Sequence, residues 1–236
     1  MNRLPKIPTR KEFCKMVEEC EEKHGIINCV YSKCIEEFGR IQPLSKLKEE
    51  QANRIIKTFL VNWGRMERRL GKKKKGIDGI EEIRKKLVCL STESEIEKFR
   101  KKKLLHTRDS ELEEHRQQIS DLYEQIRHVK TFKKKKKGQE EKEKQDFGPT
   151  GAAKILHLSC PDFFPPWDEG IRTKLGFDDE DEAKDYFNFM RYVQKIWIRR
   201  IIAINKLADG QRGDSRIYPI GIIDEYLWEK FVGKNE

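Results

Sequence analysis

The stretch from Phe147 to Gly176 constrains the fold most, because it is the longest part of the chain with few runs of lysine or glutamate. A Gly148-Pro149 turn opens it, and Thr150 can cap the helix that follows. The apolar members of that helix are Ala152, Ala153, Ile155, Leu156 and Leu158. Cys160-Pro161 ends the pattern, which therefore predicts a short apolar helix with small residues where another backbone can approach closely.

A proline-bounded aromatic loop follows this helix. Phe163, Phe164 and Trp167 lie among three prolines, so the loop is rigid and is either buried or a contact surface. Asp168 comes next, where the spacing predicts the start of a helix over Glu169–Leu175. An aspartate at this position can act as a structural N-cap, which stabilises a helix by about 1 kcal/mol.

The rest of the chain has the periodicity of charged amphipathic helices, with no alternating strand pattern and no internal repeat. Helices are predicted over residues 10–23, 26–38, 45–70, 77–90, 109–129, 183–207 and 224–231. The run from Ser91 to Ser94 can cap a further helix with Ile96, Phe99 and Leu104 on its buried side. The predicted fold class is all-α.

The predicted domain organisation is a single α-helical unit over residues 1–236, with a two-lobed unit as the alternative. In that alternative, residues 45–160 form a barrel-like helical lobe with the hairpin, and residues 1–40 with 175–236 form the second lobe. Residues 131–146 carry five consecutive lysines and almost no apolar content. We expect a mobile, solvated basic segment there.

Basic residues exceed acidic ones, 51 to 41, and the formal net charge is +10. The excess lies in three runs, Lys72–Lys75, Lys101–Lys103 and Lys133–Lys137. This clustering favours a polyanionic partner, with DNA as the expected one, although a thermophile-like composition gives similar totals. No apolar run approaches the roughly 18 residues that cross a membrane, and the N-terminus lacks the apolar centre of a signal peptide. We expect a cytoplasmic protein with no membrane partner, and its oligomeric state stays open.

Four of the six cysteines fall in the first 34 residues, as Cys14, Cys20, Cys29 and Cys34. None has the Cys-x-x-Cys spacing of a zinc site, so no metal site is predicted. In a helical hairpin Cys20 would lie near Cys29, and Cys14 near Cys34, which makes nested disulfides possible. Reduced, buried thiols are the alternative. The other two cysteines, which we expect in the core, are Cys89 and Cys160.

Several common enzyme motifs are absent, including the phosphate loop, the dinucleotide-binding glycine pattern, His-Glu-x-x-His and the Gly-x-Ser-x-Gly elbow. A glycine turn before a helix offers a different chemistry, because backbone N–H groups at a helix N-terminus can hold a phosphate. Gly148, Thr150 and Gly151 are therefore candidate contacts to a DNA backbone. Lys154, about one turn further on, can add a charge-assisted contact.

The order of these residues resembles the helix-hairpin-helix DNA glycosylase superfamily, which includes endonuclease III and the 8-oxoguanine glycosylases. That family places a glycine-rich hairpin, an alanine-containing helix, a loop of prolines and apolar residues, and an aspartate before a helix that often carries arginine. The matching residues here are Gly148, Gly151-Ala152-Ala153, Pro161 to Trp167, Asp168 and Ile171-Arg172. The likeness is confined to residues 147–176.

The resemblance implies a multi-helix orthogonal bundle and hydrolysis of an N-glycosidic bond in damaged DNA. It assigns the catalytic role to Asp168, whose carboxylate would stabilise an oxocarbenium ion and orient a water. Arg172 is a candidate phosphate ligand, with a surface ion pair as the alternative. His157 and Trp167 are candidate pocket residues, with core packing as the alternative.

The chain also departs from the family. The usual Leu-Pro-Gly-Val-Gly hairpin is absent, and the basic segment before Gly148 is unusually long. The lysine of the bifunctional members would fall near Thr150 to Gly151, so we expect a monofunctional enzyme unless Lys154 replaces that lysine. No cysteine follows Asp168, whereas the cluster cysteines of endonuclease III do, so no iron–sulfur cluster or other cofactor is predicted. The alternative function is a non-catalytic α-helical module that binds nucleic acid or protein.

Overall fold

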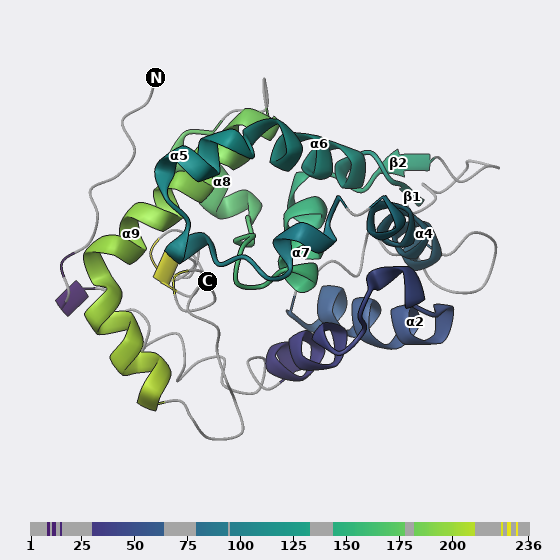
Figure 1. Cartoon of the computed structure of the whole chain (residues 1–236), viewed down its shortest axis with the longest axis horizontal. Helices are drawn as coiled ribbons and strands as arrows, with labels where there is room; N and C mark the ends of the chain where they lie inside the picture. The colour runs from purple at the N-terminus through teal and green to yellow at the C-terminus, as the bar shows by residue number, and fades with distance from the viewer. Residues whose placement is uncertain are drawn as a thin grey trace, which may run out of the picture.

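The computed structural model describes residues 9, 11, 12, 15, 30–63, 79–93, 95–132, 144–177, 182–210, 223, 226, 227 and 230. These residues are mostly helical (Figure 1). After a helix over residues 30–39, the elements are η1 (Leu44–Lys46), α2 (Glu49–Thr58), η2 (Phe59–Trp63), α4 (Gly79–Thr92), η3 (Glu97–Phe99), η4 (Leu104–His106), α5 (Asp109–Glu114), α6 (Arg116–Arg127), β1 (Lys130–Phe132), β2 (Lys144–Asp146), α7 (Pro149–Ser159), α8 (Glu169–Leu175) and α9 (Glu182–Gly210). Among them no helix is both long and apolar enough to cross a membrane.

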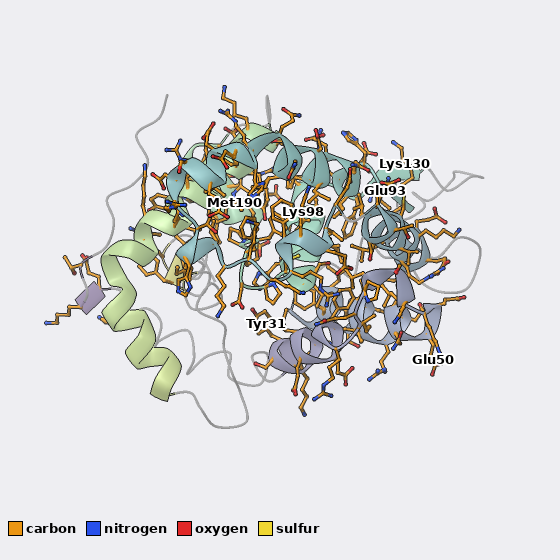
Figure 2. All side chains as sticks on the ribbon, in the orientation of Figure 1. Tyr31, Glu50, Glu93, Lys98, Lys130 and Met190 are labelled. Atoms are coloured by element: carbon orange, nitrogen blue, oxygen red, sulfur yellow. The ribbon has the colours of Figure 1, made fainter. Side chains whose placement is uncertain are left out.

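The helix α7 lies at the centre of this arrangement (Figure 1). Every residue from Gly151 to Ser159 is buried. The helix packs against α6, which in turn packs against α9, and α2 packs against α4. Figure 2 labels Tyr31, which joins the helix over residues 30–39 to α7 through its contact with His157. The apolar pattern and small residues of α7 explain this position, because they allow neighbours to pack on all of its sides.

The prediction of a mainly helical fold is confirmed, and the described residues add one small two-stranded sheet that the sequence pattern did not indicate. β1 and β2 pair in an antiparallel ladder, with Lys130 opposite Asp146 and Phe132 opposite Lys144. Strands of three residues are too short to show an alternating pattern. This ladder occupies both ends of the segment 131–146, which we expected to be a mobile connection, and residues 133–143 lie outside the described residues.

The start of α7 also differs from the prediction. Gly148, not Thr150, is the N-cap residue, and Pro149 takes the first helical position that suits its fixed φ. Gly148 has φ 85° and ψ 174°, a conformation that residues with a Cβ rarely adopt. Its N–H donates to the carbonyl of Arg127 (3.0 Å), so the turn is tied to the end of α6.

The expected helix around residues 96–104 is also wrong. Ile96, Phe99 and Leu104 are buried as predicted, but they lie on turns that include η3 and η4. Backbone groups of this segment bond outside it: the side-chain amide of Gln194 donates to the carbonyl of Leu104 (3.1 Å), and the N–H of Leu104 donates to the carbonyl of Asp162 (2.9 Å). The segment therefore combines local hydrogen bonds of 3₁₀ type, such as that from the N–H of Phe99 to the carbonyl of Ile96 (3.1 Å), with tertiary hydrogen bonds at Leu104.

The remaining helix boundaries differ less from the predictions. The helix expected from Ser45 begins at Glu49, after the 3₁₀ turn η1, and the helix expected over 109–129 is divided at His115 into α5 and α6. The helix over residues 30–39 ends at Gly39, as predicted, and α9 covers the long helix predicted over 183–207. The predicted helices 10–23 and 224–231 lie largely outside the described residues.

The cysteines divide between the core and the surface. Cys160 is buried, as expected, whereas Cys89 is exposed, so its assignment to the core is wrong. Cys89 lies on the solvent side of α4, and its neighbours Leu87 and Leu90 supply the buried side. Cys34 is a buried free thiol, and burial raises its pKa to about 11. Cys14, Cys20 and Cys29 lie outside the described residues.

Gly151→Ala should destabilise the protein by about 1–3 kcal/mol, the usual cost of overpacking a core. A Cβ at this position would lie 2.7 Å from the ring of Phe147, which is itself fully buried. Gly39→Ala is the matched control, because its Cβ would meet no atom within 4 Å, and replacing a glycine at a compatible site usually stabilises by about 0.4–1 kcal/mol. Urea unfolding of both variants measures the difference, and equal stabilities would show that Gly151 is not closely packed.

Candidate active site

The candidate site lies where α7 faces the N-terminus of α8. Lys154, on the second turn of α7, places its Nζ 2.8 Å from Oδ2 of Asp168. The lysine side chain is 3% exposed and the aspartate side chain 36% exposed. The pair therefore presents a carboxylate to solvent and keeps the ammonium in the interior.

Asp168 occupies the N-cap position of α8, with the extended backbone that a cap requires, but its side chain makes no capping hydrogen bond. The carboxylate is directed to Lys154 instead. An ammonium taken out of water loses its hydration, and a carboxylate at hydrogen-bond distance offsets part of that loss. The aromatic loop before Asp168 thus positions the Asp168 carboxylate beside the buried Lys154 of α7.

His157 lies one turn further along α7 and is fully buried. Its Nδ1 is 2.7 Å from the carbonyl oxygen of Phe164, and its Nε2 is 2.7 Å from the hydroxyl of Tyr31. Because a carbonyl only accepts, Nδ1 carries the hydrogen and Nε2 accepts from Tyr31. Burial lowers the pKa of His157 to about 4, so the ring is neutral at pH 7. These contacts place His157 in the core.

Trp167 is also in the core, with 1% of its surface exposed. Its ring stacks on Phe189 with 5.7 Å between centroids and an interplanar angle of 15°. The guanidinium of Arg172 lies 5.8 Å from the centre of the Trp167 ring. In this arrangement both of the broad ring faces that a base would stack on are covered by the protein's own side chains.

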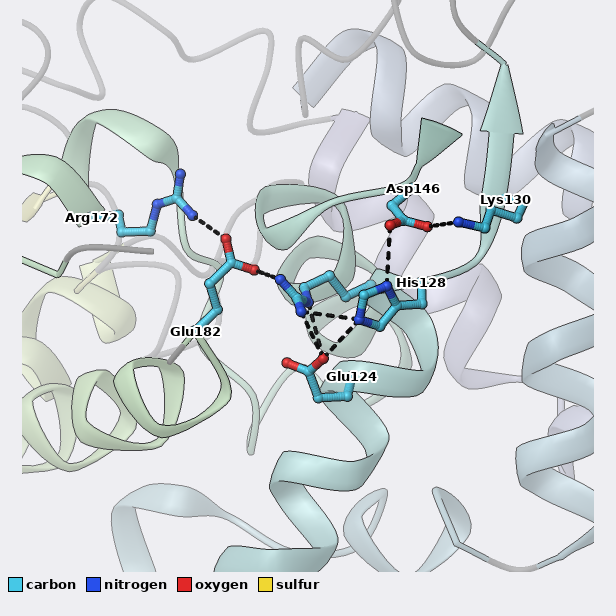
Figure 3. Close-up of polar contacts among 7 residues, drawn as sticks. Glu124, His128, Lys130, Asp146, Arg172 and Glu182 are labelled. Carbon is cyan, nitrogen blue, oxygen red and sulfur yellow. Dashed lines mark hydrogen bonds and ion pairs between the residues drawn. The ribbon is translucent and has the colours of Figure 1, made fainter. Parts of the chain in front are cut away.

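Arg172 forms an ion pair, but in the interior and not on the surface. Its Nη1 is 3.1 Å from Oε1 of Glu182, and both side chains are buried. The other oxygen of Glu182 pairs with Arg127 of α6 (Figure 3). Glu182 therefore joins α8 to α6 at the start of α9, and it holds the helix that Asp168 begins.

The same network continues to the strands (Figure 3). Oε2 of Glu124 accepts from Arg127 and lies 3.0 Å from Nε2 of His128, whose Nδ1 lies 3.2 Å from Asp146. A hydrogen bond from Lys130, with a smaller contribution from His128, lowers the pKa of Asp146. The ladder of β1 and β2 is thus fastened to the end of α6, directly before the Gly148 turn.

The hairpin residues are positioned mainly by packing. The N–H of Gly148 donates to the carbonyl of Arg127, and Gly151 packs against the ring of Phe147. Thr150 is half-buried. Lys154, which we expected to add a phosphate contact, is turned to Asp168. Among the described residues, no three His, Cys, Asp or Glu side chains are grouped so that they could hold a metal ion.

The structure thus brings Lys154 and Asp168 together and places His157, Trp167 and Arg172 in the interior around them. Sequence reasoning did not predict the ion pair, nor the contribution of Glu182 and Tyr31. One signal was available: Lys154 is the only charged residue of an otherwise apolar helix, and a lysine in such a helix needs a carboxylate partner. Glu182 and Tyr31 have no comparable signal, because Glu182 is 55 residues from Arg127 in the chain and Tyr31 is 126 residues from His157.

No protein-family model, curated protein or solved structure matches this chain. Its function is therefore inferred from the geometry of the site and from the resemblance of residues 147–176.

The two halves of the ion pair should differ in their effect on stability. Asp168→Asn removes the carboxylate that lies 2.8 Å from the buried Lys154 ammonium, and it should cost about 3 kcal/mol. Lys154→Met keeps the length and apolar stem of the side chain, and it should cost about 1 kcal/mol or less. In the double variant the loss should approach that of Lys154→Met alone. Urea unfolding of the four proteins tests this cycle, and additive losses would contradict it.

His157 should make the protein less stable as the pH falls from 6.5 to 4. The pKa of the ring is about 4 in the folded chain against 6.5 as a reference, so over this window only the unfolded chain binds a proton. The free energy of unfolding should then fall by up to about 1.4 kcal/mol per pH unit from this group. His157→Gln, which cannot titrate, should flatten the slope measured by urea unfolding between pH 6.5 and 5. An unchanged slope in that variant would count against a neutral, buried His157.

Proposed function

We propose that the protein binds DNA and hydrolyses the N-glycosidic bond of a damaged nucleotide, with Asp168 as its catalytic residue. The observation that supports this most directly is the partly exposed carboxylate of Asp168 at the start of α8, held by the buried ammonium of Lys154 at 2.8 Å. A fixed anion near C1′ of a nucleotide would stabilise the positive charge that develops as the base departs, and it could orient the attacking water.

The pair favours hydrolysis over lyase chemistry. A Schiff base requires a free amine that reaches C1′ of the sugar, whereas Nζ of Lys154 is almost fully buried and bound to Asp168. The carboxylate is the half of the pair that a substrate can reach. This geometry supports a monofunctional enzyme.

The base would have to approach Asp168 from solvent. His157 and Trp167 are closed into the core by Tyr31 and Phe189, so neither offers a surface for an extruded base in this arrangement. The excess of basic residues supplies the attraction to DNA that such an enzyme needs.

A non-catalytic nucleic-acid-binding module is the second candidate, and one observation favours it. The buried ammonium of Lys154 gives Asp168 a structural reason to be present, independent of any substrate. In that case the aromatic loop around Trp167 has only a structural role, as part of the hydrophobic core.

Base release from duplexes that carry single lesions distinguishes the two candidates, with binding to an abasic-site analogue and to undamaged DNA measured over a salt series. Wild type should prefer lesion DNA and release a base, and Asp168→Asn should lose base release. Glu169→Gln is the matched control, because it removes an exposed carboxylate from the next residue of α8.

The double variant Lys154→Met/Asp168→Asn separates catalysis from folding. It should recover stability and still release no base, because the carboxylate is absent. If base release returned together with stability, Asp168 would have only a structural role. If borohydride trapped wild type covalently on DNA, the reaction would pass through a Schiff base at an amine such as Lys154. That result would contradict a monofunctional enzyme. Absence of DNA binding at low salt would remove both candidates.

A further inference from the structure

A surface hollow of about 460 Å³ lies away from the residues of the candidate active site. It is formed by the helix over residues 30–39, the turn that contains η1, and the first two turns of α2. Four basic side chains and one carboxylate line it, namely Arg40, Lys46, Lys48, Arg54 and Glu37. No residue of α7 or α8 contributes to its lining.

The charges of this hollow are only partly compensated. Arg54 pairs with Glu37 at 2.6 Å, and Arg40 pairs with Glu36 at 2.5 Å. In the part of the chain that the structure describes, neither Lys46 nor Lys48 has a carboxylate within ion-pair distance. Both lysines are exposed. The two glutamates are thus matched by the two arginines, and two positive charges remain at the hollow.

Neutral donors add to this positive potential. The side-chain oxygen of Gln51 accepts from the backbone N–H of Lys48 (3.1 Å), which leaves the amide nitrogen of Gln51 as a donor at the lining. The first turn of α2 also lies here, and the N–H groups of a helix N-terminus attract anions. Glu49 and Glu50 of that turn do not line the hollow.

We propose that this hollow binds a phosphate group, with Lys46 and Lys48 as its principal ligands. A phosphate matches the site because it is an anion that offers several acceptor oxygens to lysine ammonium and amide donors. The phosphate could belong to a nucleic-acid backbone or to a free polyphosphate compound, and both present the same group. This site is independent of base excision at Asp168.

The test compares two double variants. Lys46→Gln/Lys48→Gln removes the two uncompensated charges. Lys33→Gln/Lys57→Gln is the matched control, because these two exposed lysines belong to the helices that form the hollow but do not line it. All four lysines are exposed, so both variants should fold. Each protein is titrated with a duplex DNA over a salt series and, separately, with inorganic tripolyphosphate, which is followed by the rise in Tm.

If the phosphate belongs to DNA, Lys46→Gln/Lys48→Gln should reduce the slope of log K against log salt by about 1.8, or about 0.9 for each phosphate that a lysine no longer neutralises, while the control variant changes it less. If the phosphate belongs to a free compound, tripolyphosphate should raise the Tm of wild type and of the control but not of Lys46→Gln/Lys48→Gln. Either result supports the site. Equal behaviour of the two variants in both titrations, or no binding of either probe by wild type, would overturn it.

The experiment is separable from the test of base excision. Base release depends on Asp168, which neither double variant changes, and the tripolyphosphate titration requires no DNA. A protein that binds tripolyphosphate but releases no base would retain the phosphate site and lose the proposed activity.

Discussion

The burial of α7 from Gly151 to Ser159 is the constraint on which the other features of this structure depend. A helix at the centre of the core must leave no polar group without a partner, because water cannot reach it there. Two of its side chains are ionisable, Lys154 and His157, and each is matched by a group from another part of the chain. The aromatic loop after α7 supplies both partners: the carbonyl of Phe164 for the histidine and the carboxylate of Asp168 for the lysine. The path of that loop is therefore set by electrostatics as well as by packing.

The position of α8 follows from the same requirement. Asp168 must lie beside Lys154, and Glu182 then holds the following helix through Arg172 while it also binds Arg127 of α6. An ion pair of this kind adds little net stability compared with apolar packing, but it specifies one arrangement, since either partner alone would be costly in the interior. The candidate catalytic carboxylate thus stands at the junction of α7 and α8. A rigid position of this kind is what a catalytic group requires.

The positive charge of the protein is not uniformly available for binding. Lys154 and Arg172 are used inside the fold, and Arg40 and Arg54 are paired with glutamates at the surface. The number of basic residues alone therefore overstates what a polyanion would meet. The lysines at the hollow beside α2 differ, because in the described residues they lie next to arginines whose charges are already matched. This contrast is why they, rather than the residues of the hairpin, are the better candidates for a phosphate contact.

The sequence by itself determined the helical class, the central apolar helix and the place where α8 begins, since these depend on local periodicity, prolines and chain stiffness. It also indicated Asp168 as a candidate site residue, because Asp168 follows a rigid loop and precedes a helix. Only the tertiary structure decided what those residues do. Whether Asp168 caps a helix or pairs with Lys154, and whether Arg172 is exposed or buried, depends on how successive helices pack on one another, because one ion pair joins α7 to the start of α8 and the other joins α8 to α9. The same holds for residues 96–104, where short 3₁₀ turns occur in place of the predicted helix and Gln194 and Asp162 bond to the backbone of Leu104. The local sequence pattern determines where most helices form, but the packing of the whole chain determines which residue pairs with a buried charge.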